Sequence, residues 1–131
     1  AQLLMPGHGE LWDILQGLEK TDLVIGISLP RYTTITVEVL EHARSQRARV
    51  GAITDSPLSP LARHAHWVLT AECQLDSFIE SFTAVTSLIN ALLTAMSIQK
   101  PNKTLRILRE REAIWEEKGV YISDHKTRKS K

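Results

Sequence analysis

The chain has 131 residues, an apolar fraction of 43% and a formal net charge of +1 at neutral pH, which are values typical of one globular domain. Its single cysteine, Cys73, excludes an internal disulfide bond and a zinc site built on several thiolates. The longest mostly apolar stretch, residues 85–98, is short and interrupted by polar residues, so it is predicted to be a buried helix rather than a membrane span. The N-terminus shows no secretory signal pattern, and we therefore expect a cytoplasmic protein.

The first half of the chain alternates short apolar runs with longer amphipathic segments. The predicted strands are residues 3–5, 23–27, 49–53 and 67–70, and the predicted helical segments are residues 10–18, 32–46 and 60–64. In the second helical segment, Ile35, Val39 and Ala43 recur every four positions and predict the face that packs on the sheet. This alternation predicts an α/β fold with a parallel sheet, and strands that are apolar on both faces predict helices on both sides of it.

The second half is predicted to contain two long helices. Ser77 and Glu80 have the spacing of a capping box, and apolar residues recur at helical spacing after them. Pro101 is expected to end this helix, Asn102 to cap the next one, and Gly119 to end that helix in a left-handed conformation. Apolar residues on more than one side of the first long helix predict a homodimer.

The expected domain organisation is one domain over residues 1–122 and a basic tail over residues 123–131. The tail contains no apolar residue, so we expect it to be disordered and solvated rather than a DNA-binding arm.

The loop after the strand at residues 23–27 is the main candidate for chemistry. Ligands of open parallel sheets bind beyond the carboxyl ends of the strands, where helix N-termini present unpaired amides. Hydroxyls, amides and a guanidinium together suit a phosphate. The candidate ligand-binding residues are Ser28, Arg31, Tyr32, Thr33, Thr34 and, in the next loop, Asp55. On spacing alone a second interpretation is equally good, in which Ser28 caps the helix and Thr33 and Thr34 are ordinary first-turn residues. Asp55 is expected to cap the turn at residues 56–59 rather than to act as a base.

Two stretches carry a resemblance to a known family. Residues 22–28 (DLVIGIS) with Thr33 and Glu38, and residues 53–62 (ITDSPLSPLA), resemble the SIS (sugar isomerase) domains of RpiR-family transcriptional regulators, over residues 22 to 98. The family's loop reads Ser-x-Ser-Gly-x-Thr and binds a sugar phosphate.

Ser28 matches the first serine of that loop and Thr33 its threonine. Pro30 and Arg31 stand where the family has its second hydroxyl residue and its glycine. Pro30 removes a hydroxyl and an amide donor. Arg31 adds a charged guanidinium group, which can donate two parallel hydrogen bonds to a phosphate or a carboxylate.

The resemblance implies a flavodoxin-like, three-layer SIS domain that lacks its first strand and first helix, which should expose two strand edges. It implies a sensor, not an enzyme, that takes a phosphorylated sugar or sugar acid without a metal or cofactor. DNA would be bound only through a helix-turn-helix domain that this chain does not contain. Two alternatives remain: a sugar-phosphate isomerase, with Glu80 as the candidate base, and a dimerisation module whose pocket has decayed.

Overall fold

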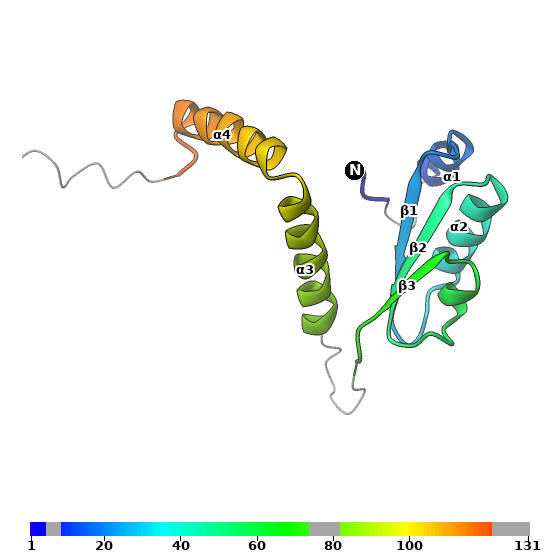
Figure 1. Cartoon of the computed structure of the whole chain (residues 1–131). Helices are drawn as coiled ribbons and strands as arrows, with labels where there is room; N and C mark the ends of the chain where they lie inside the picture. The colour runs from blue at the N-terminus through cyan, green and yellow to red at the C-terminus, as the bar shows by residue number, and fades with distance from the viewer. Residues whose placement is uncertain (5–8, 74–81, 122–131) are drawn as a thin grey trace, which may run out of the picture. The chain divides into compact units, whose positions relative to one another are not determined.

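The computed structural model describes residues 1–4, 9–73 and 82–121, and the described residues form two units, one up to Ile89 and one from Asn90 onward. The first unit contains the sheet (Figure 1). Its elements, in chain order, are α1 (Glu10–Gln16), β1 (Leu23–Ile27), α2 (Thr34–Ser45), β2 (Arg49–Thr54), the short 3₁₀ helix η1 (Pro60–Arg63), β3 (Trp67–Thr70) and the start of α3 (Thr83–Gln99). The second unit contains the rest of α3 and α4 (Pro101–Lys118).

The sheet has three parallel strands in the order β1-β2-β3, so the predicted α/β fold with a parallel sheet is confirmed. Leu23 lies opposite Arg49, and Gly51 lies opposite Trp67. Among the described strands, β1 and β3 are the edges. The strand predicted at residues 3–5 is wrong for its described part, because residues 1–4 form no strand and no described strand pairs with them; Met5 lies outside the described residues.

Helix α2 covers one face of the sheet, with α1 beside it (Figure 1). Leu40 of α2 is fully buried and packs in one cluster with Val50 and Ala52 of β2. A methyl group on Gly26 of β1 would lie 2.8 Å from Leu40, so the absence of a side chain at Gly26 lets the helix approach the strand closely. The predicted contact face of α2 is partly correct: Ala43 is buried, but Leu40 rather than Val39 forms the centre of the contact. The central cluster consists of Leu40, Ala43, Ala48, Val50, Ala52 and Leu61.

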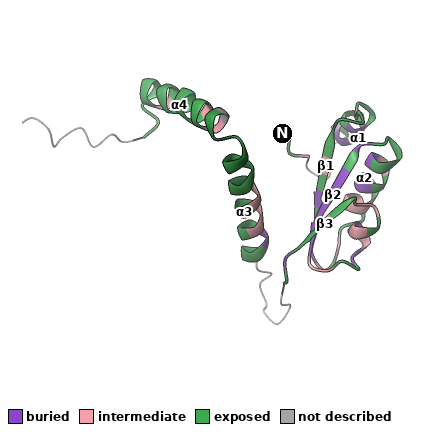
Figure 2. Cartoon of the chain, in the orientation of Figure 1, coloured by how far each residue is buried: buried purple, intermediate pink, exposed green. Residues whose placement is uncertain are grey.

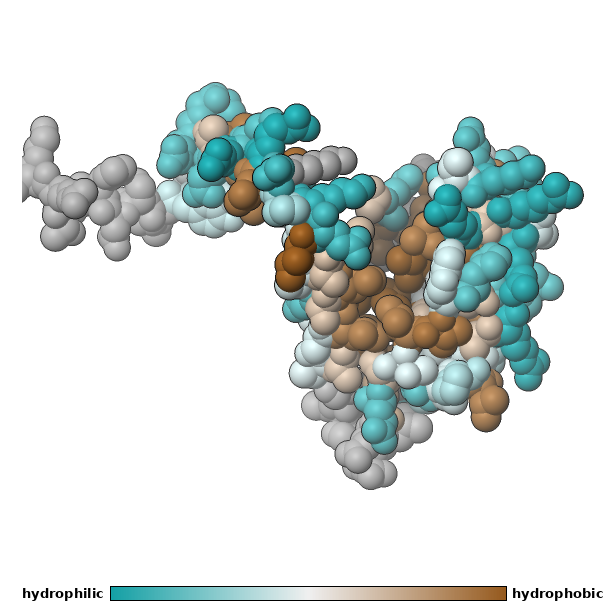
Figure 3. Space-filling view, in the orientation of Figure 1, coloured by the Kyte–Doolittle hydropathy of each residue, from teal (hydrophilic) through white to brown (hydrophobic). Residues whose placement is uncertain are grey.

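Among the described residues, the other face of the sheet is covered at its carboxyl end. There Ile53 packs with Leu29, Ala71 and Val85, the last of which belongs to the first turn of α3. Along the rest of this face apolar side chains remain 38–57% exposed: Leu23, Ile25, Ile27, Trp67 and Leu69. In Figure 2 burial is concentrated in β2 and α2, and in Figure 3 hydrophobic side chains gather over the strands. The expected helices on both faces are thus present as α2 on one face and the start of α3 at one end of the other.

The ends of α4 follow local rules of helix capping. Pro101 is the first residue of α4, because its missing amide is tolerated in a first turn, so Asn102 lies inside the helix instead of capping it. Gly119 has φ 58°, and the amides of Gly119 and Val120 bond to the carbonyls of Glu116 and Trp115, as predicted for this end. The predicted capping pair Ser77 and Glu80 lies outside the described residues, as does the basic tail.

Candidate functional site

The loop that follows β1 folds back toward the start of α2. The Ser28 amide donates to the Ile53 carbonyl at 3.2 Å, which ties the loop to the end of β2. Leu29 is buried in the cluster at the carboxyl end of the sheet and anchors the loop there. The Thr33 amide then donates to Ser28 Oγ over a long 3.4 Å. A hydrogen bond of that length is weak, so a stronger acceptor at the same place can replace it.

The start of α2 places two hydroxyls and several amides together. Thr33, not Ser28, is the N-cap residue, and no side chain caps the helix from that position. Instead Thr33 Oγ1 and Thr36 Oγ1 share a hydrogen bond of 2.8 Å. The first amides of a helix have no acceptor within the helix, so those of Thr34 and Ile35 are available to an anion. Thr36 is a residue that the sequence analysis missed, although its position three residues after Thr33 was a usable signal.

Arg31 lies between these groups with a left-handed backbone. Its φ is 67°, a conformation that costs an L-residue roughly 1–2 kcal/mol and costs glycine almost nothing. This is the position at which the resembling loops carry glycine. The loop thus combines a backbone conformation that glycine favours with an exposed arginine side chain at this position.

Tyr32 joins the two loops at the carboxyl ends of β1 and β2. Its hydroxyl donates to Asp55 Oδ1 at 2.8 Å, and Thr54 Oγ1 donates to the same oxygen at 3.1 Å. The hydrogen bond to Asp55, followed by burial, raises the pKa of Tyr32 above its usual value of 10.0, so the phenol keeps its proton and remains a donor at neutral pH.

The prediction that Asp55 caps the next turn is wrong. The Ser56 hydroxyl does so by accepting from the Leu58 amide at 3.2 Å. The structure thus brings Ser28 and Thr33 together through a hydrogen bond within the loop, and it links Tyr32 to Asp55, which lies 23 residues further along the chain.

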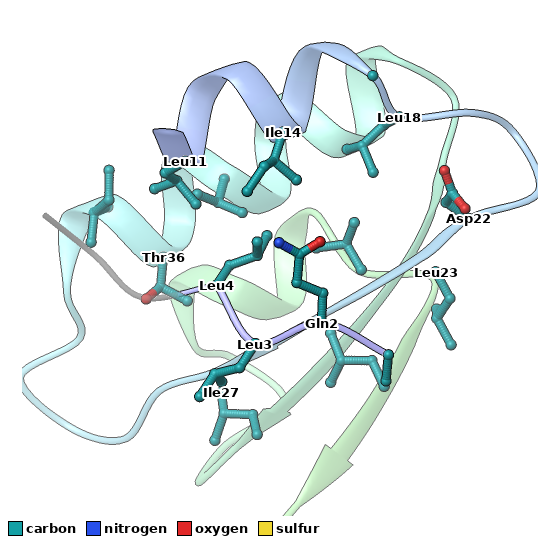
Figure 4. Close-up of a pocket in the computed structure, with 16 residues that line it drawn as sticks. Gln2, Leu3, Leu4, Leu11, Ile14, Leu18, Asp22, Leu23, Ile27 and Thr36 are labelled. Carbon is teal, nitrogen blue, oxygen red and sulfur yellow. The ribbon is translucent and has the colours of Figure 1, made fainter. Parts of the chain in front are cut away.

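A cavity of about 570 Å³ runs along β1 and reaches the first turn of α2 at Ile35 and Thr36. Figure 4 shows it between Leu11 and Ile14 of α1 with Leu18, which follows that helix, on one side and the N-terminal residues with β1 on the other. The Gln2 amide points into it, and Thr36 borders it at the start of α2. Of the residues at the candidate site, only Thr36 lines the cavity, so the predicted anion loop is an open surface feature beside it rather than its floor.

Other candidate groups in the described part of the chain do not form a site. No three His, Cys, Asp or Glu side chains there are placed to hold a metal ion. Cys73 packs against the cluster that contains Val85. The His42 ring packs edge-on against Trp12 with centroids 5.8 Å apart, and its Nε2 is buried without a hydrogen-bond partner. None of the helices described here has the length and apolarity needed to cross a membrane.

Comparison with known protein families identifies the family to which this fold belongs. The family model of the SIS domain matches residues 3–95, which include the sheet and the candidate loop. The chain belongs to the SIS domain family. The match confirms the family resemblance that the sequence motifs indicated.

Solved structures give the same result at the level of the fold. The chain is similar to the sugar isomerase domain of an RpiR transcription factor from Sphaerobacter thermophilus, with a TM-score of 0.79 and 34% identity over 84% of this chain and 62% of that one. A structure of a hypothetical protein has a TM-score of 0.57 at 20% identity, over 69% of this chain and 55% of that one, and shows a likeness of fold alone. No curated protein sequence matches.

Proposed function

We propose that this SIS domain is the effector-sensing domain of a sugar-responsive transcriptional regulator, and that it binds a phosphorylated sugar or a sugar acid without catalysing a reaction. In this proposal the protein is cytoplasmic, and DNA is bound by a separate helix-turn-helix domain. The similarity to the RpiR transcription factor supports this class of function.

The observation that carries the proposal is the start of α2. Thr33, Thr34 and Thr36 supply hydroxyls there, the first amides of a helix of 12 residues lack acceptors, and Ser28 Oγ lies 3.4 Å from the Thr33 amide. Donors of this kind at a helix N-terminus favour an anion, because the helix dipole adds to their hydrogen bonds. The anionic group would replace Ser28 Oγ as the acceptor of the Thr33 amide, and the Ser28 hydroxyl would then donate to the anion. The Arg31 side chain would provide a further, charged contact.

Calorimetric titration with a panel of sugar phosphates and sugar acids tests this proposal. Each hydrogen bond to a charged group contributes roughly 1.5–3 kcal/mol, so Ser28→Ala or Thr33→Ala should weaken binding about tenfold or more. A larger loss for Arg31→Ala than for Ser28→Ala would mean that the guanidinium has become the main anchor.

Ser45→Ala is the matched control, since Ser45 Oγ donates to the His42 carbonyl at the opposite end of α2. If the parent protein binds no member of the panel, or if the three loop variants bind like the parent, the loop is not the effector site. Turnover of a bound sugar phosphate would favour the isomerase alternative instead.

We also propose that the regulator is a homodimer. In the second unit, apolar side chains of α3 and α4 remain 50–72% exposed and border a groove of about 550 Å³: Leu93, Ile98 and Leu105. Surfaces of this kind mark interaction sites in soluble proteins. Light scattering at increasing protein concentration should give the mass of two chains, and a monomer mass at all concentrations would contradict the proposal.

A further inference from the structure

Asp55 is held in place between the two loops at the carboxyl ends of β1 and β2. Its Oδ1 accepts hydrogen bonds from Tyr32 and from Thr54, whose side chain is fully buried. Both contacts use the same oxygen, and within the described residues no hydrogen bond reaches Oδ2. The carboxylate is therefore fixed in orientation while keeping acceptor capacity.

The charge of this carboxylate limits what can bind beside it. Tyr32, which donates a hydrogen bond to Asp55, directly precedes Thr33 at the start of α2. A negative carboxylate next to an anion-binding helix end repels an anion that comes close to it. The same carboxylate is a strong acceptor for hydroxyl groups, because hydrogen bonds to an ionised acceptor are shorter and stronger than neutral ones.

These two properties divide the site into an anion-binding part and a hydroxyl-binding part. We propose that Asp55 selects the ligand by accepting hydrogen bonds from the hydroxyl groups of a polyhydroxylated anion, while Tyr32 and Thr54 act as positioning residues that orient its carboxylate. This inference rests on the proposed function and names its ligand class. A small anion without hydroxyl groups gains nothing from Asp55 and is repelled by it.

Asp55→Asn is the decisive variant because it keeps an oxygen that can accept from Tyr32 and Thr54 but removes the negative charge. The two probes are the tightest-binding sugar phosphate of the panel and sulfate, which has no hydroxyl group at neutral pH, each titrated into parent and variant by calorimetry. We expect Asp55→Asn to bind the sugar phosphate about tenfold more weakly and to bind sulfate as well as the parent does or more tightly.

Tyr32→Phe provides a second variant with the charge of Asp55 intact. It removes one of the two donors that orient the carboxylate, so it should lower the ratio of sugar-phosphate affinity to sulfate affinity by a smaller factor than Asp55→Asn does. If Asp55 and Tyr32 only hold the two loops together, Tyr32→Phe should lower the affinity for both probes equally and leave that ratio unchanged.

Two results would overturn the inference: an equal loss of affinity for both probes in Asp55→Asn, or an unchanged affinity for both probes in that variant. If Asp55→Asn does not fold, as judged by its circular dichroism, an unchanged affinity ratio in Tyr32→Phe overturns it as well. If the parent protein binds no sugar phosphate, both the proposed function and this inference are contradicted. That result is obtained with the parent protein, before any substitution is made.

Discussion

Helices α2 and α4 are both amphipathic, but their apolar sides have different surroundings. In α2, Leu40 and Ala43 are completely buried against the sheet of their own unit. In α4, every side chain that the structure describes is at least partly exposed, and Leu105 and Leu108 are each 50% exposed. An apolar stripe along a helix therefore predicts the helix and its contact face. Which segment covers that face depends on the tertiary structure.

The largest effect that this comparison predicts is at Leu40. Leu40→Ala should lower the free energy of unfolding by about 2–5 kcal/mol, because it leaves a cavity between α2 and β2. The matched substitution Leu108→Ala in α4 should change it by no more than about 0.5 kcal/mol in a monomer. Urea denaturation of both variants measures the difference.

An equally large loss for Leu108→Ala would break the comparison, because it would mean that α4 is covered under the conditions of the assay. Repeating the denaturation at several protein concentrations would then separate a second chain from an intramolecular partner, since only a dimer has a concentration-dependent stability.

A smaller effect is expected where α2 approaches β1. In Gly26→Ala the added methyl group would lie 2.8 Å from the fully buried Leu40, so the helix and strand must separate or repack. We expect a loss of about 1–3 kcal/mol, measured by thermal unfolding. Gly51→Ala in β2 is the control, because its nearest contact beyond its chain neighbours would be 3.6 Å away. Equal losses in the two variants would show that the close approach of α2 is not the cause.

The smallest effect is expected at the end of α4, which depends on local conformation. Gly119→Ala forces an alanine into the left-handed region at φ 58°, where nothing else lies within 4 Å of the new methyl group. The cost should be about 1 kcal/mol and should be confined to fraying of the last turn. Hydrogen exchange of the Gly119 and Val120 amides reports it, and unchanged protection of these amides would argue against the local explanation.

The predicted elements were most accurate where an apolar run is bounded by polar residues or turns. The strands at residues 23–27 and 67–70 have the predicted bounds, and Gly119 takes the predicted conformation. The strand predicted at residues 3–5 had the right composition but no described partner, and a strand needs hydrogen bonds from a neighbour to form. Pro101 marked a helix boundary correctly, although it begins α4 instead of only ending α3.

The candidate site was predictable where its contacts are local. Ser28 and Thr33 lie five residues apart and meet through a hydrogen bond, so their spacing was informative. The bond between Tyr32 and Asp55 spans 23 residues, and the register that brings them together comes from the pairing of β1 with β2. The left-handed backbone of Arg31 could not be predicted from the sequence, because arginine rarely adopts this conformation.

The sequence by itself determined the α/β class, the positions of β1, β2, β3 and α2, and the presence of polar donors at the start of α2, because periodicity, turn residues and residue chemistry act over short distances. Only the tertiary structure decided that Asp55 is held by Tyr32 and that Leu40 is the centre of the core. Those outcomes depend on strand register and on the close approach of α2 at Gly26, which arise only when distant segments pack together.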